Sequence, residues 1–272
     1  MCEASTTTCA EAPVATCGLC GAGYCTRHQA ATPSGNTLLV CTSCRDNYWT
    51  ADSEAVPGSL ATAHERWVRE GRPKQEAFRY RRQAWIGSLP EYGEFISGLP
   101  DRLSRSFISN LGRSAHEGER EAAKTFIAMQ IWGYGANPKY GPFRTEKALS
   151  TPPSVDLPIT AAQRLQAVAL VLRQDGNVEA YRVLGREYKL DRLGPSFGTK
   201  YLFFVSAIPG RAPALVLDSL VSGWLESNTG LRLDSNSWSH QGYGEYLFAM
   251  YSWAADLGEP PDTVEFIIFR NS

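Results

Sequence analysis

The sequence lacks an apolar run of membrane-spanning length, and its first residues lack the basic and then apolar order of a signal peptide. We therefore expect a cytoplasmic protein without a membrane partner. An excess of one charge is also missing, because the formal net charge is −1 over 272 residues. This balance argues against nonspecific coating of nucleic acid but not against a local basic face. The length suffices for one sizeable domain and a small module.

Cysteine is absent after Cys44, so all seven cysteines of the chain lie within the first 44 residues. In a cytoplasmic protein, clustering of this kind indicates a metal site before a disulfide. Cys17 and Cys20 form one Cys-x-x-Cys pair, and Cys41 and Cys44 form another. Two such pairs predict a structural zinc ion held by four thiolates in a tetrahedral site. Redox-active thiols are the weaker alternative for these pairs.

A third pair, Cys25 and His28, lies between the two Cys-x-x-Cys pairs. This order of pairs resembles a truncated cross-brace finger of the FYVE or B-box kind. The resemblance implies that Cys25 and His28 hold a second zinc ion, which Cys9 and Cys2 could complete. The basic lipid-binding signature of FYVE fingers is missing ahead of Cys25, so phosphoinositide binding is not expected. Modules of this kind are structural or bind a protein partner.

Lysine is scarce, with only six among the 27 basic residues, and the excess of Arg together with frequent Ala indicates a GC-rich, bacterial genome. One of these lysines, Lys200, follows a tight turn between two expected helices. Gly194 and Gly198 allow backbone angles that a Cβ would obstruct, and Pro195 prevents one continuous helix. The amides of such a turn can face an anion. An amine near a helix start and beside apolar residues favours the neutral, nucleophilic form.

Asp218 lies 18 residues after Lys200, at the end of an apolar run and at the start of a helical pattern. An aspartate at this position is expected to cap the helix, and its carboxylate can also face the cavity that the lysine faces. Each residue alone has an ordinary structural interpretation, as a turn lysine or a helix cap. Their combination and spacing favour a functional pair.

The turn and the pair together resemble the helix-hairpin-helix DNA glycosylases of the 8-oxoguanine type. In that family a Pro-Gly-hydrophobic-Gly turn precedes Thr-Lys, and an Asp follows roughly twenty residues later. The matching residues are Pro195, Phe197, Gly198, Thr199, Lys200 and Asp218, while Ser196 stands where the family has its first hairpin glycine. The resemblance covers roughly residues 100 to 257. It implies a mainly α fold in which Lys200 and Asp218 are catalytic and Gly194, Ser196, Gly198 and Thr199 contact DNA.

The same resemblance implies two further contact regions. A loop rich in glycine, proline and aromatic residues spans 132–145, where the family inserts into the duplex, so Tyr134, Asn137 and Arg144 are candidates for DNA contacts. An aromatic helix is expected at 238–253, where His240, Gln241 and Tyr243 could line the pocket for the flipped base. A packed structural loop and an ordinary aromatic core stripe are the respective alternatives.

The pattern of helices and breaks predicts three regions. Residues 1–50 form the zinc module, and residues 51–98 contain linker and basic helices. The linker is expected at 50–60, because Pro57 and Gly58 oppose regular structure there. The stretch at 61–87 is expected to be helical with an interruption at 71–73, and its basic and aromatic residues form either a phosphate-tracking surface or a solvated helix face. Residues 99–272 form the glycosylase domain. Its further helices are expected at 99–113, 117–131, 160–173, 177–188, just after Asp218, and at 262–269. Asp101, Ser114, Thr160 and Asp262 are the expected caps.

The function predicted by these features is excision of a modified or oxidised base from DNA through a Schiff-base lysine, with AP-lyase activity as an optional second step. Either base-excision repair or defence against phage with modified DNA would use this chemistry. Two alternatives from other classes stay open. The hairpin could serve only to bind DNA, or the zinc module could be an adaptor for a protein partner with the helical body as scaffold.

Overall fold

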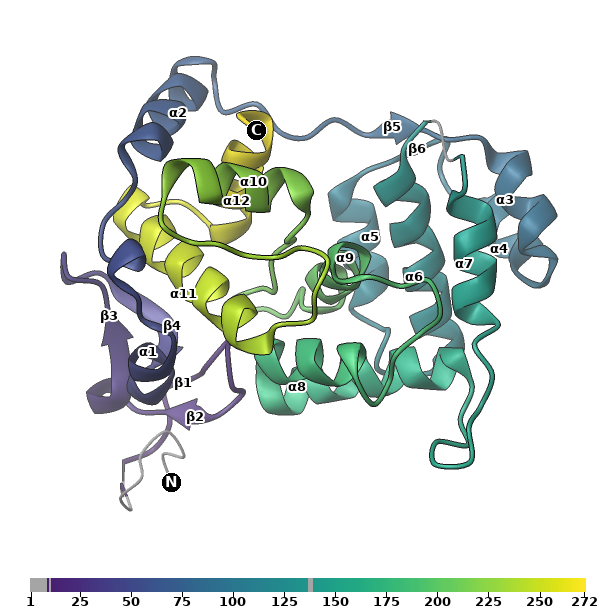
Figure 1. Cartoon of the computed structure of the whole chain (residues 1–272), viewed down its shortest axis with the longest axis horizontal. Helices are drawn as coiled ribbons and strands as arrows, with labels where there is room; N and C mark the ends of the chain where they lie inside the picture. The colour runs from purple at the N-terminus through teal and green to yellow at the C-terminus, as the bar shows by residue number, and fades with distance from the viewer. Residues whose placement is uncertain (1–8, 10, 137–138) are drawn as a thin grey trace.

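The computed structural model describes residues 9, 11–136 and 139–272, and helices dominate this part of the chain (Figure 1). The α-helices are α1 (Thr42–Tyr48), α2 (Gly58–Arg69), α3 (Arg82–Ser88), α4 (Gly93–Gly98), α5 (Arg105–Gly112), α6 (Glu119–Tyr134), α7 (Gly141–Leu149), α8 (Ala161–Gly185), α9 (Pro195–Val205), α10 (Ser219–Asn228), α11 (His240–Leu257) and α12 (Pro261–Arg270). The prediction of a mainly α fold is confirmed.

Three short antiparallel strand pairs accompany the helices. They are β1 (Ala15–Thr16) with β2 (Gly23–Tyr24), β3 (Gln29–Ala31) with β4 (Thr37–Cys41), and β5 (Phe78–Arg79) with β6 (Arg102–Leu103). The first two pairs belong to the cysteine-rich segment, whereas β5 and β6 join two distant parts of the body. Among the described residues, every helix is too short or too polar to cross a lipid bilayer.

Helix α9 is the central element of the body. Its residues from Gly198 to Val205 are all buried, because the apolar run after Lys200 leaves no polar face for solvent. It packs against α5, α6 and α8. Figure 1 shows α9 between the group formed by α10, α11 and α12 and the group formed by α3 to α7. The residues on α9 therefore lie where the two groups of helices meet.

Helix α8 leads into the hairpin and is bent at Gly176, where φ is 85°. The Thr160 hydroxyl caps the first turn by accepting from the Gln163 amide at 3.2 Å, and Gln163 Oε1 accepts a hydrogen bond from the Thr160 amide at 2.9 Å. The two helices predicted at 160–173 and 177–188 are the two halves of α8 on either side of this bend. The predicted cap at Thr160 is confirmed.

Several predicted helix starts are wrong by a few residues. Helix α5 begins at Arg105, because the Ser104 hydroxyl accepts a hydrogen bond from the Phe107 amide at 3.2 Å. Asp101 is not a cap, and its carboxylate pairs with Arg82 at 2.7 Å. Helix α6 follows Gly118 instead of Ser114. The C-terminal helix is confirmed, but Pro260 occupies its cap position and Asp262 lies in its first turn.

Residues 50–60, predicted to be a linker, are held against the body. A capping box between Thr50 and Ser53 closes a 3-10 turn at Ala51–Ser53, which contacts α11. Pro57 then caps α2 instead of breaking regular structure, and α2 packs on α12. Beyond α2 the chain crosses the molecule in extended form to β5, as Figure 1 shows along its upper edge. The predicted interruption at 71–73 is therefore confirmed, but it is longer than expected, because α2 ends at Arg69 and α3 begins only at Arg82.

Candidate active site and metal centre

A lysine and an aspartate meet at the centre of the fold. Lys200 Nζ donates a hydrogen bond to Asp218 Oδ2 at 3.0 Å, and the two side chains are only 9% and 15% exposed. Lys200 is the sixth residue of α9, so it lies one turn inside the helix and not at its start as the sequence suggested. The negatively charged carboxylate of Asp218 lies directly opposite the amine.

Asp218 is also the N-cap of α10. Its Oδ1 atom accepts hydrogen bonds from the Leu220 and Val221 amides, each at 3.2 Å, which confirms the predicted cap. Burial raises the pKa of this carboxyl group, but Lys200 and the two amides outweigh burial, so the pKa of Asp218 lies below its ordinary value. One carboxylate oxygen therefore holds the helix while the other faces the amine.

Close helix packing surrounds the amine of Lys200. The Phe197 ring lies 5.3 Å from Nζ, and Ser196 Oγ is 3.4 Å from it. Helix α6 approaches so closely that a Cβ added at Gly133 would lie 2.7 Å from the Phe197 ring and 3.4 Å from Lys200 Cδ. Only a glycine in α6 permits this approach. Gly133 belongs to the site, although the sequence analysis did not single it out.

A second buried ion pair lies near the first. Both guanidinium Nη atoms of Arg105 contact the Glu265 carboxylate, at 3.0 and 3.1 Å. Burial raises the pKa of Glu265 and Arg105 partly offsets this effect; Asp218 and Lys200 also act on it through their charges. The sequence analysis missed this pair. The sequence did contain one indication of the pair, because Glu265 interrupts the apolar pattern of α12. A carboxylate buried among apolar residues needs a charged or hydrogen-bonding partner.

The hairpin residues predicted to bind DNA divide into exposed and buried positions. Gly194 is exposed at the N-cap of α9, and Ser196 follows on its first turn. Thr199 is buried, and its hydroxyl donates to the Ser196 carbonyl at 3.1 Å and accepts from the Leu217 amide at 3.0 Å. Gly198 is also buried, under the ring of Trp238. Thr199 and Gly198 are therefore packing residues inside the hairpin.

Replacing Gly198 by alanine should destabilise the hairpin. A Cβ at this position would lie 2.3 Å from Trp238 Cη2, so the indole must move and its packing on Tyr181 is lost. We expect the free energy of unfolding to fall by about 1–3 kcal/mol, measured by urea denaturation. Gly223→Ala on α10 is the matched control, because nothing lies within 4 Å of its Cβ position, and it should stabilise the protein by about 0.5–1 kcal/mol. Equal effects of the two changes would contradict the packing argument.

The loop predicted at 132–145 is shorter than expected, because α6 continues to Tyr134 and α7 begins at Gly141. The Tyr134 ring stacks on Phe197 with centroids 4.6 Å apart, so its position is tied to α9. Arg144 is exposed on α7. Asn137, the third candidate, lies outside the described residues. The neighbouring Tyr140 and Phe143 are large exposed aromatic side chains that the sequence analysis did not name.

The three residues predicted for the base pocket differ in environment. Tyr243 is buried, stacks on Tyr181 at 4.2 Å, and donates its hydroxyl hydrogen to the Leu215 carbonyl at 2.9 Å. It borders a cavity of about 250 Å³ that Leu217, Arg232 and Asp234 also line. Gln241 is exposed and donates to the Asn47 carbonyl at 3.2 Å, and His240 is half-buried at the start of α11. The geometry gives Tyr243 a packing role, and the base pocket stays a prediction.

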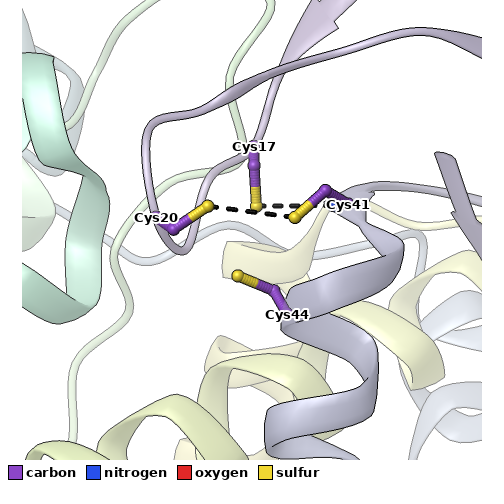
Figure 2. Close-up of side chains that lie close together, drawn as sticks. All are labelled: Cys17, Cys20, Cys41 and Cys44. Carbon is purple, nitrogen blue, oxygen red and sulfur yellow. Dashed lines mark hydrogen bonds between the residues drawn. The ribbon is translucent and has the colours of Figure 1, made fainter. Parts of the chain in front are cut away.

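Four cysteine thiols form a compact cluster near the N-terminus (Figure 2). Cys17 and Cys20 come from the loop after β1, Cys41 ends β4, and Cys44 lies on α1. Their sulfur atoms lie within 4.8 Å of one another, and those of Cys20 and Cys41 are 3.9 Å apart. Tetrahedral zinc with Zn–S bonds of about 2.3 Å separates its sulfur ligands by about 3.8 Å. The four thiols therefore fit a structural metal ion of this kind.

A second group of metal-binding side chains contains Cys9, Cys25 and His28, with ligand atoms also within 4.8 Å of one another. His28 Nδ1 is 3.2 Å from Cys25 Sγ, and Cys9 Sγ is 3.8 Å from the same sulfur. Cys25 and His28 thus come together as the pattern of pairs predicted, and Cys9 joins them. Cys2, the other cysteine considered for this group, lies outside the described residues.

Comparisons with known proteins bear on the body of the chain. A family model described as "Putative 8-oxoguanine DNA glycosylase OGG-like protein" matches residues 71–269. Searches of curated proteins and of solved structures found no match. The matched segment contains α9 with Lys200, α10 with its cap Asp218, and the helices around them. Because this match spans well over half of the sequence, the chain belongs to the OGG-like family of DNA glycosylases, which implies DNA as its substrate.

Proposed function

We propose that the protein excises a modified base from DNA with Lys200 as the nucleophile and Asp218 as its charged partner. The observation that carries this proposal is the contact of 3.0 Å between a buried amine and a buried carboxylate in a chain of the OGG-like family. Buried ion pairs are costly to desolvate and give little net stability, so a buried lysine that faces the aspartate at the start of α10 is better explained by chemistry.

The reaction begins when a nucleotide leaves the duplex and its sugar approaches Lys200. Once Nζ has lost its proton, the nitrogen lone pair attacks C1′ of the sugar, and the base departs with the electrons of the glycosidic bond and takes up a proton. Opening of the sugar ring then gives a Schiff base between Nζ and C1′. Loss of a proton from C2′ can expel the 3′ phosphate by β-elimination, which is the AP-lyase step.

Asp218 acts in this scheme as an ionised carboxylate. Its low pKa makes it a weak proton acceptor, so its main contribution is to stabilise positive charge that develops at C1′ and on Nζ. The two amide hydrogen bonds to Oδ1 fix its orientation before substrate arrives. Such preorganised charge stabilises a transition state without reorganisation during the reaction.

The N-terminus of α9 is the proposed DNA phosphate site. Pro195 has no amide hydrogen, and the amides of Ser196 and Phe197 in the first turn have no partner within the helix, so they can bind a phosphate oxygen. Gly194 leaves room beside them. Arg192 and Lys189 are exposed on the preceding turn and add positive charge. Such contacts position the duplex without selecting its sequence, and Tyr134, Asn137 and Arg144 are proposed to contact the duplex nearby.

The metal in this proposal is zinc with a structural role. Cys17, Cys20, Cys41 and Cys44 would hold one ion, and Cys25 and His28 would hold a second with Cys9 as a further ligand. The segment around these residues has little apolar surface of its own, so bound zinc would stabilise it. None of the bond changes at C1′ requires a metal, and the ions would act only through folding.

Borohydride trapping tests the enzymatic proposal. Duplexes carrying 8-oxoguanine, an abasic site or modified cytosines are incubated with the protein and reduced, which converts a Schiff base into a permanent adduct. We expect an adduct with at least one of them, and the duplex that traps best identifies the base class and separates repair from defence against modified phage DNA. If a folded, metal-loaded protein forms no adduct and excises no base, the binding-module or adaptor alternative replaces this proposal.

Asp218→Asn should separate the charge of this residue from its capping role. Asparagine is as good a helix cap as aspartate, so α10 should remain capped and the melting temperature should change little. The rate of adduct formation should fall by about 10²–10³-fold, because the negative charge beside C1′ is gone. Single-turnover trapping and thermal unfolding on the same sample measure the two effects. If the rate of adduct formation falls only as far as the fraction of folded protein falls, Asp218 has a purely structural role.

A further inference from the structure

The loop that carries Cys17 and Cys20 is inserted into the bend of α8. The carbonyl oxygens of Gly18 and Leu19 accept hydrogen bonds from the Asn177 and Val178 amides at 3.0 and 3.1 Å. A Cβ at Gly176 would lie 2.5 Å from the Leu19 oxygen. The metal-binding loop therefore supplies the acceptors that the first amides of the second half of α8 need at the bend. That half of α8 is the first arm of the hairpin.

Asn177, at the bend, connects this loop to the segment that precedes Asp218. Its side chain is fully buried. Nδ2 donates to the Ala212 carbonyl and to the Tyr251 hydroxyl, each at 3.1 Å, and Tyr251 in turn donates to the Pro213 carbonyl at 2.7 Å. The metal-binding loop also touches this segment directly, because a Cβ at Gly18 would lie 2.7 Å from Ala212 Cβ.

Two more tyrosines of α11 hold the rest of this segment. Tyr243 donates to the Leu215 carbonyl at 2.9 Å and Tyr246 to the Val216 carbonyl at 2.7 Å. Residues 212–217 have no helical or strand hydrogen bonding of their own, and all except Pro213 are buried. Side chains therefore satisfy carbonyls that secondary structure would otherwise satisfy, and they fix the path of the chain into Asp218.

We propose that Asn177 is a positioning residue, which links the four-cysteine metal site to Asp218 through Tyr251 and residues 212–217. Metal binding orders the loop, the loop and Asn177 hold this segment, and the segment sets the distance between the Asp218 carboxylate and Lys200. The inference rests on the proposed function, since it assigns the network a role in that reaction. Because a carboxylate displaced by about 1 Å costs a rate of the order of a hundredfold, small shifts of the segment matter.

Asn177→Leu tests the link, since leucine has a similar size and no amide. The adduct-forming rate should fall about ten- to a hundredfold, with DNA affinity within about twofold of wild type. Tyr251→Phe, which keeps the ring in place, should lower the rate in the same direction if Asn177→Leu folds poorly. Asn228→Leu is the matched control, because this exposed amide bonds only within α10 at 2.8 Å, and it should leave the rate unchanged.

Combination with Asp218→Asn shows whether Asn177 acts through Asp218. In the Asp218→Asn background, Asn177→Leu should lower the rate no further, because the group that it positions has lost its charge. If Asn177→Leu lowers the adduct-forming rate by the same factor in the wild-type and Asp218→Asn backgrounds, the proposal is overturned and Asn177 is a general packing residue. So would a well-folded Asn177→Leu protein with the wild-type rate.

Hydrogen–deuterium exchange provides a readout that needs no activity. Amides in residues 214–221 should exchange faster in Asn177→Leu and after the wild-type protein is treated with a zinc chelator, whereas amides of α6 should not. If exchange of residues 214–221 is the same with and without metal, the link does not exist, whatever the enzyme assay gives. If the wild type forms no adduct but its exchange responds to metal, the link stands and the proposed reaction fails.

Discussion

Lys200→Gln will form no borohydride-trapped adduct with any duplex that the wild-type protein traps. The side chain of glutamine can still donate a hydrogen bond to Asp218 Oδ2, so the buried carboxylate keeps a partner and the fold should persist. What is lost is the only nitrogen at this position that can form a Schiff base. We expect the rate to fall by roughly a thousandfold or more, to the level of the reaction without enzyme.

Lys189→Gln is the control for this experiment. Lys189 is exposed on the turn of the same hairpin, so its loss should weaken DNA binding and reduce its salt dependence while the adduct still forms. An adduct of normal yield in Lys200→Gln would assign the covalent step to another amine. Mass spectrometry of the trapped peptide would then locate that amine directly.

The second large effect concerns the four-cysteine site. Cys44→Ser should release about one metal ion per chain and lower the free energy of unfolding by several kcal/mol, because thiolate ligation supplies much of the stability of such small segments. The loop that carries Cys17 and Cys20 is hydrogen-bonded to the bend of α8. We therefore expect the second half of α8, the first arm of the hairpin, to lose stability as well. Elemental analysis and urea denaturation of the purified variant measure both quantities.

Cys9→Ser is the matched comparison for Cys44→Ser. Cys9 belongs to the other group of ligands, so its replacement should spare the ion held by the four cysteines and cost less stability. If Cys44→Ser keeps its full metal content, the four thiols do not form the site. If Cys9→Ser loses as much metal and as much stability as Cys44→Ser, the two groups of ligands share one ion.

Features set by neighbours in sequence could be predicted from the sequence. The caps at Thr160 and Asp218 depend on residues within one turn, and the Cys-x-x-Cys pairs bring their thiols together wherever the chain leads. The pairing of Lys200 with Asp218 was expected from the spacing and chemistry of the two residues and from the family resemblance. The structure then supplied the distance between the two groups and their burial.

Features set by distant contacts could not be predicted in this way. Arg105 and Glu265 form an ion pair although they are 160 residues apart in the sequence. The residues next to each of them give no indication of the partner. Tyr243 lies on an aromatic helix whose pattern suits a pocket wall and a core face equally, and its hydrogen bond to the distant Leu215 carbonyl could not be predicted from that pattern. Residues 50–60 were predicted to be a linker because of Pro57 and Gly58, yet the turn at Ala51–Ser53 contacts α11, and this distant contact leaves no local signal in the sequence.

The insertion of the metal-binding loop at the bend of α8 has a consequence for the order in which the protein matures on the ribosome. The four thiols emerge early, whereas Gly176 and Asn177, which receive the loop, emerge much later, by roughly ten seconds at usual rates of translation. During that interval the thiols have no body to pack against. Thiols without a bound metal are therefore more open to oxidation in newly made chains than in mature ones.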